Sequence, residues 1–88
     1  MHKYQRHVKE FLVKYVVEFR QEHGLTKTSM SVRLRMDPRS YLPIETGEYG
    51  LSAAALMFLL ISLEDRQVLE LVRAFESYLV LIEQTVAI

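Results

Sequence analysis

Apolar residues recur at three- and four-residue steps along most of this 88-residue chain, and this spacing is the strongest constraint on its fold. A helix brings residues three and four apart onto one face, whereas a half-buried strand needs strict alternation. The first long run of this kind predicts an amphipathic helix over residues 3–22, and the last predicts a helix over residues 64–86. With no strand expected between them, the sequence predicts an all-α domain.

Cap and turn residues predict shorter helices after the first one. Gly24 suits the end of the first helix, because glycine readily adopts the left-handed conformation found there. Thr26 can cap a second helix that ends near Arg35. Asp37 followed by Pro38 predicts an acidic cap with proline in the first helical position, where the missing N–H is not needed. These signals place a third helix directly after the second.

The fourth and fifth helices follow a break at Gly47. Ser52 can cap a fourth helix over residues 52–62, which is apolar all round and is therefore expected at the centre of the core. Ser62 and Asp65 have the spacing of a capping box that would start the last helix. Five helices joined by short connections are thus expected in a single domain spanning residues 1–88.

Composition limits the classes of protein to which the chain can belong. Half of the residues are apolar, which is enough for a small core, and no cysteine offers a disulfide or a thiolate metal site. The longest uncharged apolar stretch, residues 51–63, is shorter than the ~20 residues that a membrane span needs. We therefore expect a soluble cytoplasmic protein with no membrane partner.

The zero net charge conceals an uneven distribution of charge along the chain. Nine basic and five acidic side chains lie at or before Gly47, whereas two basic and six acidic ones follow it. A basic first part can approach a polyanion while the acidic second part faces elsewhere. The alternative is that both parts are ordinary solvated helix faces.

A family pattern covers the centre of the chain. Residues 24–47 read GLTKTSMSVRLRMDPRSYLPIETG, and they resemble the helix-turn-helix segment of Cro/repressor (XRE) regulators. The positions that match that family's pattern are Leu25, Thr26, Met30, Ser31, Leu34, Met36, Tyr41, Ile44, Glu45 and Gly47. The resemblance implies a five-helix, lambda-repressor-like domain with its motif at about residues 26–46, here with an extended first helix and a long C-terminal helix. It also implies a structural ion pair between Arg20 and Glu45.

The same resemblance implies contacts with double-stranded DNA. In that family the third helix enters the major groove, and the start of the second touches a phosphate. Carried over by position, the candidate DNA-binding residues are Thr26, Lys27, Thr28, Pro38, Arg39, Ser40, Pro43 and Thr46. Arg39 is the strongest candidate for reading a base, because arginine can form two hydrogen bonds with guanine. The alternative is that Arg39 is a solvated surface residue.

Three residues depart from what DNA binding favours. Pro38 and Pro43 offer no donor to a base, and Glu48 would repel phosphate. Pro43 also removes a backbone hydrogen bond, so the third helix is expected to be short, kinked or partly 3₁₀, with Arg39 and Ser40 presented from its first turn. A second interpretation is therefore a protein-interaction module, with a contact surface made of Tyr41, Leu42, Pro43 and Tyr49.

The last helix is too apolar to stand alone in water. We expect a homodimer through this C-terminal helix, about residues 64–86, with an interface made of Phe75, Leu79, Ile82 and Val86. The alternative is that these residues pack against the first helix within one subunit.

No combination of residues suggests catalysis. The three histidines lack metal-ligand spacing, and no serine has a histidine placed to activate it, so we expect no metal, no cofactor and no enzyme activity. The sequence thus predicts a bacterial or phage regulator of XRE type that binds an operator as a homodimer. The alternative is an antitoxin-like or adaptor protein with reduced DNA binding and a partner at Leu42 and Tyr49.

Overall fold

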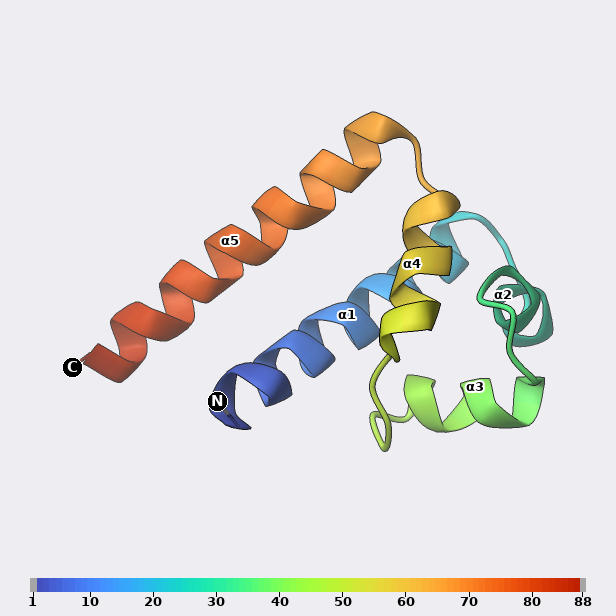
Figure 1. Ribbon diagram of the computed structural model, residues 1–88, viewed down its shortest axis with the longest axis horizontal. Coiled ribbons are helices and arrows are strands. Elements are labelled where there is room, and N and C mark those ends of the chain that lie inside the picture. The colour runs from blue at the N-terminus through green and yellow to red at the C-terminus, as the bar shows by residue number, and fades with distance from the viewer. Residues whose placement is uncertain (1, 88) are drawn as a thin grey trace.

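The computed structural model describes the backbone of residues 2–87 and the side chains of residues 4–85. Within those residues there is no strand, and the chain forms five α-helices (Figure 1): α1 (His2–Glu22), α2 (Lys27–Arg33), α3 (Pro38–Glu45), α4 (Ala53–Ile61) and α5 (Asp65–Ala87). The all-α, five-helix prediction is confirmed. None of these helices combines the length and apolar character needed to cross a membrane.

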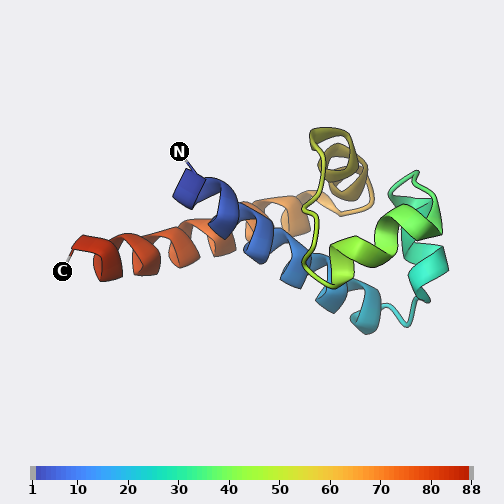
Figure 2. The same cartoon turned by 90° about the horizontal axis from the view of Figure 1, so that it is seen from below.

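The two long helices run side by side in opposite directions, and the short helices gather at one end of the molecule (Figures 1 and 2). The rings of Phe11 in α1 and Phe75 in α5 lie 5.2 Å apart between centroids. Near the start of α1, the Tyr4 hydroxyl donates to Glu83 at 2.9 Å. As a result α2 and α3 project at the opposite end from the start of α1 and the end of α5.

The expected caps form at the starts of three helices. The side chains of Thr26, Asp37 and Ser52 each accept a backbone N–H from the following turn, at 3.0, 2.7 and 3.0 Å. These bonds satisfy donors that a helix start otherwise leaves without a partner. The local sequence signals therefore fix where α2, α3 and α4 begin.

Left-handed residues end the first three helices. Gly24 follows α1 with φ +62°, and Gly47 follows α3 with φ +83°. Arg35 takes the same conformation after α2, with φ +55°, although it carries a side chain. After each helix two amides turn back to its last carbonyls; after α3, Glu48 N–H bonds to the Pro43 carbonyl at 2.9 Å. The turn between α2 and α3 is therefore tight.

The capping box predicted for the last helix is wrong. The Ser62 hydroxyl donates to the Phe58 carbonyl at 3.1 Å and so belongs to the end of α4. The start of α5 is closed instead by Glu64, whose N–H donates to the Gln67 side chain at 2.9 Å. A serine at the end of a helix can donate its hydroxyl to the carbonyl four residues earlier, so the Ser62 hydroxyl does not cap α5.

The core lies where α2, α3 and α4 meet the second half of α1. Its buried apolar residues, each less than a tenth exposed, are Val16, Phe19, Met30, Leu34, Tyr41, Ile44, Leu59, Leu63 and Leu71. Met30 and Leu34, which occupy positions of the family pattern, are both fully buried. Ser31 is also fully buried, and its hydroxyl donates to the Thr28 carbonyl at 2.6 Å. A small side chain there satisfies its own polar group without a cavity.

The fourth helix is not at the centre of the core, contrary to the prediction. It buries Ala55 and Leu59, but Met57 and Ile61 on its opposite face are 57 % and 66 % exposed. The reason is that four other helices are too few to surround α4 on all sides. The apolar outer face of α4 therefore remains uncovered within the chain.

Candidate nucleic-acid interface

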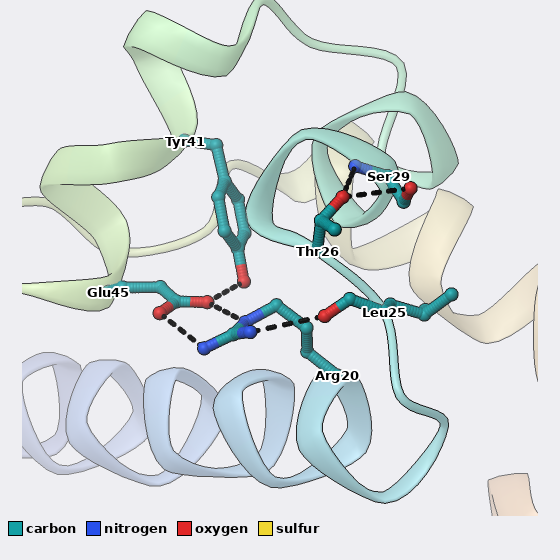
Figure 3. Close-up of polar contacts among 6 residues, drawn as sticks. All are labelled: Arg20, Leu25, Thr26, Ser29, Tyr41 and Glu45. Atoms are coloured by element: carbon teal, nitrogen blue, oxygen red, sulfur yellow. Dashed lines mark hydrogen bonds and ion pairs between the residues drawn. The ribbon is translucent and has the colours of Figure 1, made fainter.

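A polar cluster fixes the position of α3 against α1 (Figure 3). Arg20 Nε lies 2.5 Å and Nη2 3.1 Å from the two carboxylate oxygens of Glu45, the last residue of α3. Nη1 of the same arginine donates to the Leu25 carbonyl at 3.1 Å, and the Tyr41 hydroxyl donates to the Glu45 carboxylate. The expected ion pair is thus present, with Tyr41 as a third member. We call Arg20, Tyr41 and Glu45 the clamp.

The clamp keeps its charges paired at neutral pH. Burial on its own would raise the pKa of Glu45, but the hydrogen bonds from Arg20 and Tyr41 outweigh it, and the pKa lies below its ordinary value. Burial, followed by the hydrogen bond to Glu45, raises the pKa of the Tyr41 phenol. Glu45 is therefore ionised but neutralised by Arg20, so it adds little negative potential to the outer surface of α3.

The second helix presents its first residues to solvent. Thr26, Lys27 and Thr28 are all exposed. The Thr26 hydroxyl is already engaged, since it accepts the Ser29 N–H at 3.0 Å and donates to the Ser29 hydroxyl at 2.9 Å (Figure 3). Lys27 is the cation at this edge, adjacent to that cap. Of the three predicted residues, Lys27 is thus the one suited to a phosphate.

The third helix presents its first turn. Pro38, Arg39 and Ser40 are exposed, and the Arg39 side chain is 90 % accessible to solvent. Pro43 is half-buried, and Thr46 is exposed with its hydroxyl donating to the Pro43 carbonyl at 3.0 Å. The predicted residues of α2 and α3 are therefore exposed, except for the half-buried Pro43. The Thr46 hydroxyl is bonded to the end of α3.

Pro43 lies inside α3 without breaking it. The helix has eight residues and remains α-helical through the proline. Because proline lacks an N–H, the Arg39 carbonyl receives no intrahelical bond from position 43. The Pro43 carbonyl accepts the amides of Glu48 and Tyr49, at 2.9 and 3.2 Å, which ends the helix two residues later. The third helix was expected to be short, kinked or partly 3₁₀. It is short, and its first turn is intact.

The apolar surface expected for a protein partner is smaller than predicted. Tyr41 is fully buried, because its ring fills the core and its hydroxyl is bound to Glu45, so it cannot contact a partner. Leu42 and Tyr49 are 46 % and 60 % exposed. The remaining candidate contact surface is therefore Leu42, Tyr49 and the accessible part of Pro43.

Two further arginines face away from α3. The guanidinium carbon of Arg33 lies 5.8 Å from the ring centroid of Phe19, and that of Arg35 lies 4.9 Å from the ring centroid of Phe58. Both contacts direct charge toward α1 and α4. The sequence gives no local signal for them, because each aromatic ring is distant along the chain. These two arginines add to the basic first part without enlarging the surface around Arg39.

Three of the residues predicted for a dimer interface pack within the chain instead. Phe75 packs against Phe11, and Phe75, Leu79 and Ile82 are all half-buried. Val86 lies outside the described side chains. The exposed apolar residues of α5 are different ones: Leu69, Val72, Val80 and Leu81. The helix therefore packs against α1 on one face and leaves these four apolar side chains exposed on the rest of its surface.

Comparison with known proteins adds no relative: no family model, curated protein or solved structure matches this chain. Among the described residues, no group of three or more histidine, cysteine or acidic side chains is placed to hold a metal ion. The surfaces open to a partner are therefore the exposed residues of α2 and α3 and the exposed apolar residues of α4 and α5.

Proposed function

We propose that this chain is a double-stranded DNA-binding transcriptional regulator of XRE type that acts as a homodimer. The observation that carries the proposal is the placement of Arg39. Its side chain is 90 % exposed on the first turn of α3, and the clamp fixes that helix relative to α1. A rigidly held helix with an accessible arginine at its start can present that arginine to guanine in the major groove.

The charges around Arg39 support a small DNA-contacting surface. Lys27 is exposed at the start of α2 and can neutralise a phosphate, while Glu45 is paired with Arg20. Glu48 is exposed and opposes phosphate binding, but Lys9 Nζ donates to its backbone carbonyl at 3.4 Å and places a cation beside it. Pro43 limits the surface to the first turn of α3. Such a surface suits a short half-site read twice by a dimer.

The distribution of exposed apolar residues supports dimer formation. Six of the ten large hydrophobic residues exposed within residues 4–85 lie on α4 and α5: Met57, Ile61, Leu69, Val72, Val80 and Leu81. A second copy would cover part of this exposed apolar surface and join the half-buried residues Phe75, Leu79 and Ile82 to the interface. Closed two-fold dimers are the commonest assemblies of soluble chains.

Sedimentation tests the dimer separately from DNA binding. We expect the wild type to sediment as a dimer and Leu69→Glu with Val80→Glu as a monomer, because these exposed side chains share one side of α5 and a carboxylate cannot be buried there without a partner. Gln84→Glu, at an exposed polar position on the same helix, should remain dimeric. If the double variant has the same mass as the wild type, these residues are not in a dimer interface.

Binding to duplex DNA tests the regulator itself. Arg39→Ala should weaken binding to a selected duplex at least about fivefold, the lower end of the range expected for one arginine–guanine pair. Arg66 makes a matched control, since it is exposed on α5 and paired with Glu70 at 3.0 Å, far from α3 along the chain. Arg66→Ala should bind like the wild type. Equal losses in both variants would show that charge alone, and not Arg39, determines binding.

A protein-interaction module is the second candidate. The observation that favours it is the exposure of Leu42 and Tyr49 at the second half of α3 and just beyond it. In that case DNA binding is weak or absent, and Leu42→Ala with Tyr49→Ala should abolish binding of the protein partner while leaving the fold unchanged. If the same double variant loses only DNA binding, the two residues belong to the DNA-contacting surface.

A further inference from the structure

Asp37 contacts Arg39 at both its backbone and its side chain. Oδ1 of Asp37 accepts the Arg39 backbone N–H at 2.7 Å and lies 3.3 Å from Nε, while Oδ2 lies 3.5 Å from Nη2. Both side chains are accessible, at 52 % for Asp37 and 90 % for Arg39. One carboxylate thus caps α3 and also holds the guanidinium of the residue proposed to read a base.

This contact decides which part of the guanidinium is free. The edge formed by Nε and Nη2 faces Asp37, so the end that carries Nη1 and the outer hydrogen of Nη2 points to solvent. That end holds two parallel N–H groups, which match the N7 and O6 acceptors of guanine. An arginine without such a partner would rotate among many rotamers and would have to be ordered on binding.

We propose that Asp37 is a positioning residue that fixes Arg39 for end-on recognition of a guanine. This inference rests on the proposed function. The carboxylate has two effects on Arg39. It restricts the rotamers of the side chain before DNA arrives, and its negative charge opposes a swing of the guanidinium and its neighbours onto a phosphate. Asp37 thereby favours contact with a base over contact with the backbone, which raises specificity at the expense of general affinity.

The alternative is that Asp37 is only a helix cap with an incidental surface ion pair. A pair of exposed charges adds little stability, so stability alone cannot separate the two roles. Variants that keep the helix cap and remove the negative charge can distinguish the positioning role from the capping role. Asparagine and serine cap helices about as well as aspartate, and neither carries the charge that attracts a guanidinium.

The experiment compares base discrimination in Asp37→Asn, Asp37→Ser and Arg39→Ala with that of the wild type. Duplexes bound by the wild type are first selected from a random pool, and the affinity for the selected site is then divided by that for the same site with its guanine replaced by adenine. For the wild type this ratio should be about 5- to 150-fold, the range for one bidentate pair. Unchanged urea midpoints would show that both cap variants remain folded.

We expect both cap-preserving variants to lose most of this discrimination while their affinity for unselected DNA is unchanged or higher. Arg39→Ala should lose the discrimination completely. If the cap variants discriminate like the wild type while Arg39→Ala does not, the positioning role is wrong and the proposed function stands. If Arg39→Ala still discriminates, Arg39 is not the reader and the inference fails. If the wild type binds no duplex, the proposed function fails together with this inference.

Discussion

Substitution of Glu45 by alanine should destabilise the domain by about 4 kcal/mol. Glu45 accepts hydrogen bonds from Arg20 at two atoms and from the Tyr41 hydroxyl, and its side chain is only 9 % exposed. Removing one partner of a buried ion pair costs about 3–5 kcal/mol, and we take about 3 because water reaches the edge of this pair. The Tyr41 hydroxyl would also lose its acceptor inside the core, which adds about 1 kcal/mol.

This loss is large relative to the total free energy of unfolding, which is on the order of 5–10 kcal/mol for a domain of this size. Urea unfolding followed by far-UV circular dichroism measures the difference, with the slope expected to stay unchanged. Tyr41→Phe should cost about 1 kcal/mol, because the ion pair remains. Glu48→Ala provides the matched control, since that glutamate is exposed and should change stability by less than about 0.5 kcal/mol. A Glu45→Ala loss as small as the control would refute the role assigned to the clamp.

Two further predictions concern pH and Pro43. The pKa of Glu45 is lower in the folded protein than its ordinary 4.5, so its ionised form stabilises the fold above that pH and the effect is lost as the pH falls below it. The stability difference between the wild type and Glu45→Gln in urea titrations should therefore be constant near neutrality and shrink in acid; a difference that grows in acid would contradict this sign. Pro43→Ala should raise the unfolding free energy by about 2 kcal/mol, since it restores a helical bond and removes a clash worth about 3 while freeing the unfolded chain by about 1. A lower urea midpoint would show instead that proline is the better residue at this position.

Local signals predicted the secondary structure well. The apolar spacing indicated both long helices, and Thr26, Asp37 and Ser52 cap the helices that they were expected to cap. Such features depend on residues within one turn of each other, so the local sequence is enough to predict them. Ser62 is the exception, because its hydroxyl bonds to a carbonyl of α4 and does not cap α5.

Features that depend on packing between distant segments were predicted less well. Periodicity could not show that α4 would leave Met57 and Ile61 exposed, since that depends on how many elements surround it. The hydrogen bond from Tyr41 to Glu45 is local to α3, but it joins the clamp only because Arg20 of α1 reaches the same carboxylate. Asp37 and Arg39 are only two residues apart, but the cap pattern does not predict which way the Arg39 side chain points. Their side-chain contact was therefore not predicted.

The central claim is that the surface around Arg39 binds duplex DNA, and the salt dependence of binding tests it most directly. We would titrate wild type and Arg39→Ala against random-sequence duplex DNA and against a selected site at several salt concentrations. If each subunit of a dimer neutralises at least one phosphate, the logarithm of the wild-type affinity should fall with the logarithm of salt with a slope of about −2 or steeper. Arg39→Ala should bind a selected site more weakly at every salt concentration. No binding at low salt, or an affinity that does not change with salt, would contradict the account and leave Leu42 and Tyr49 as the surface to pursue.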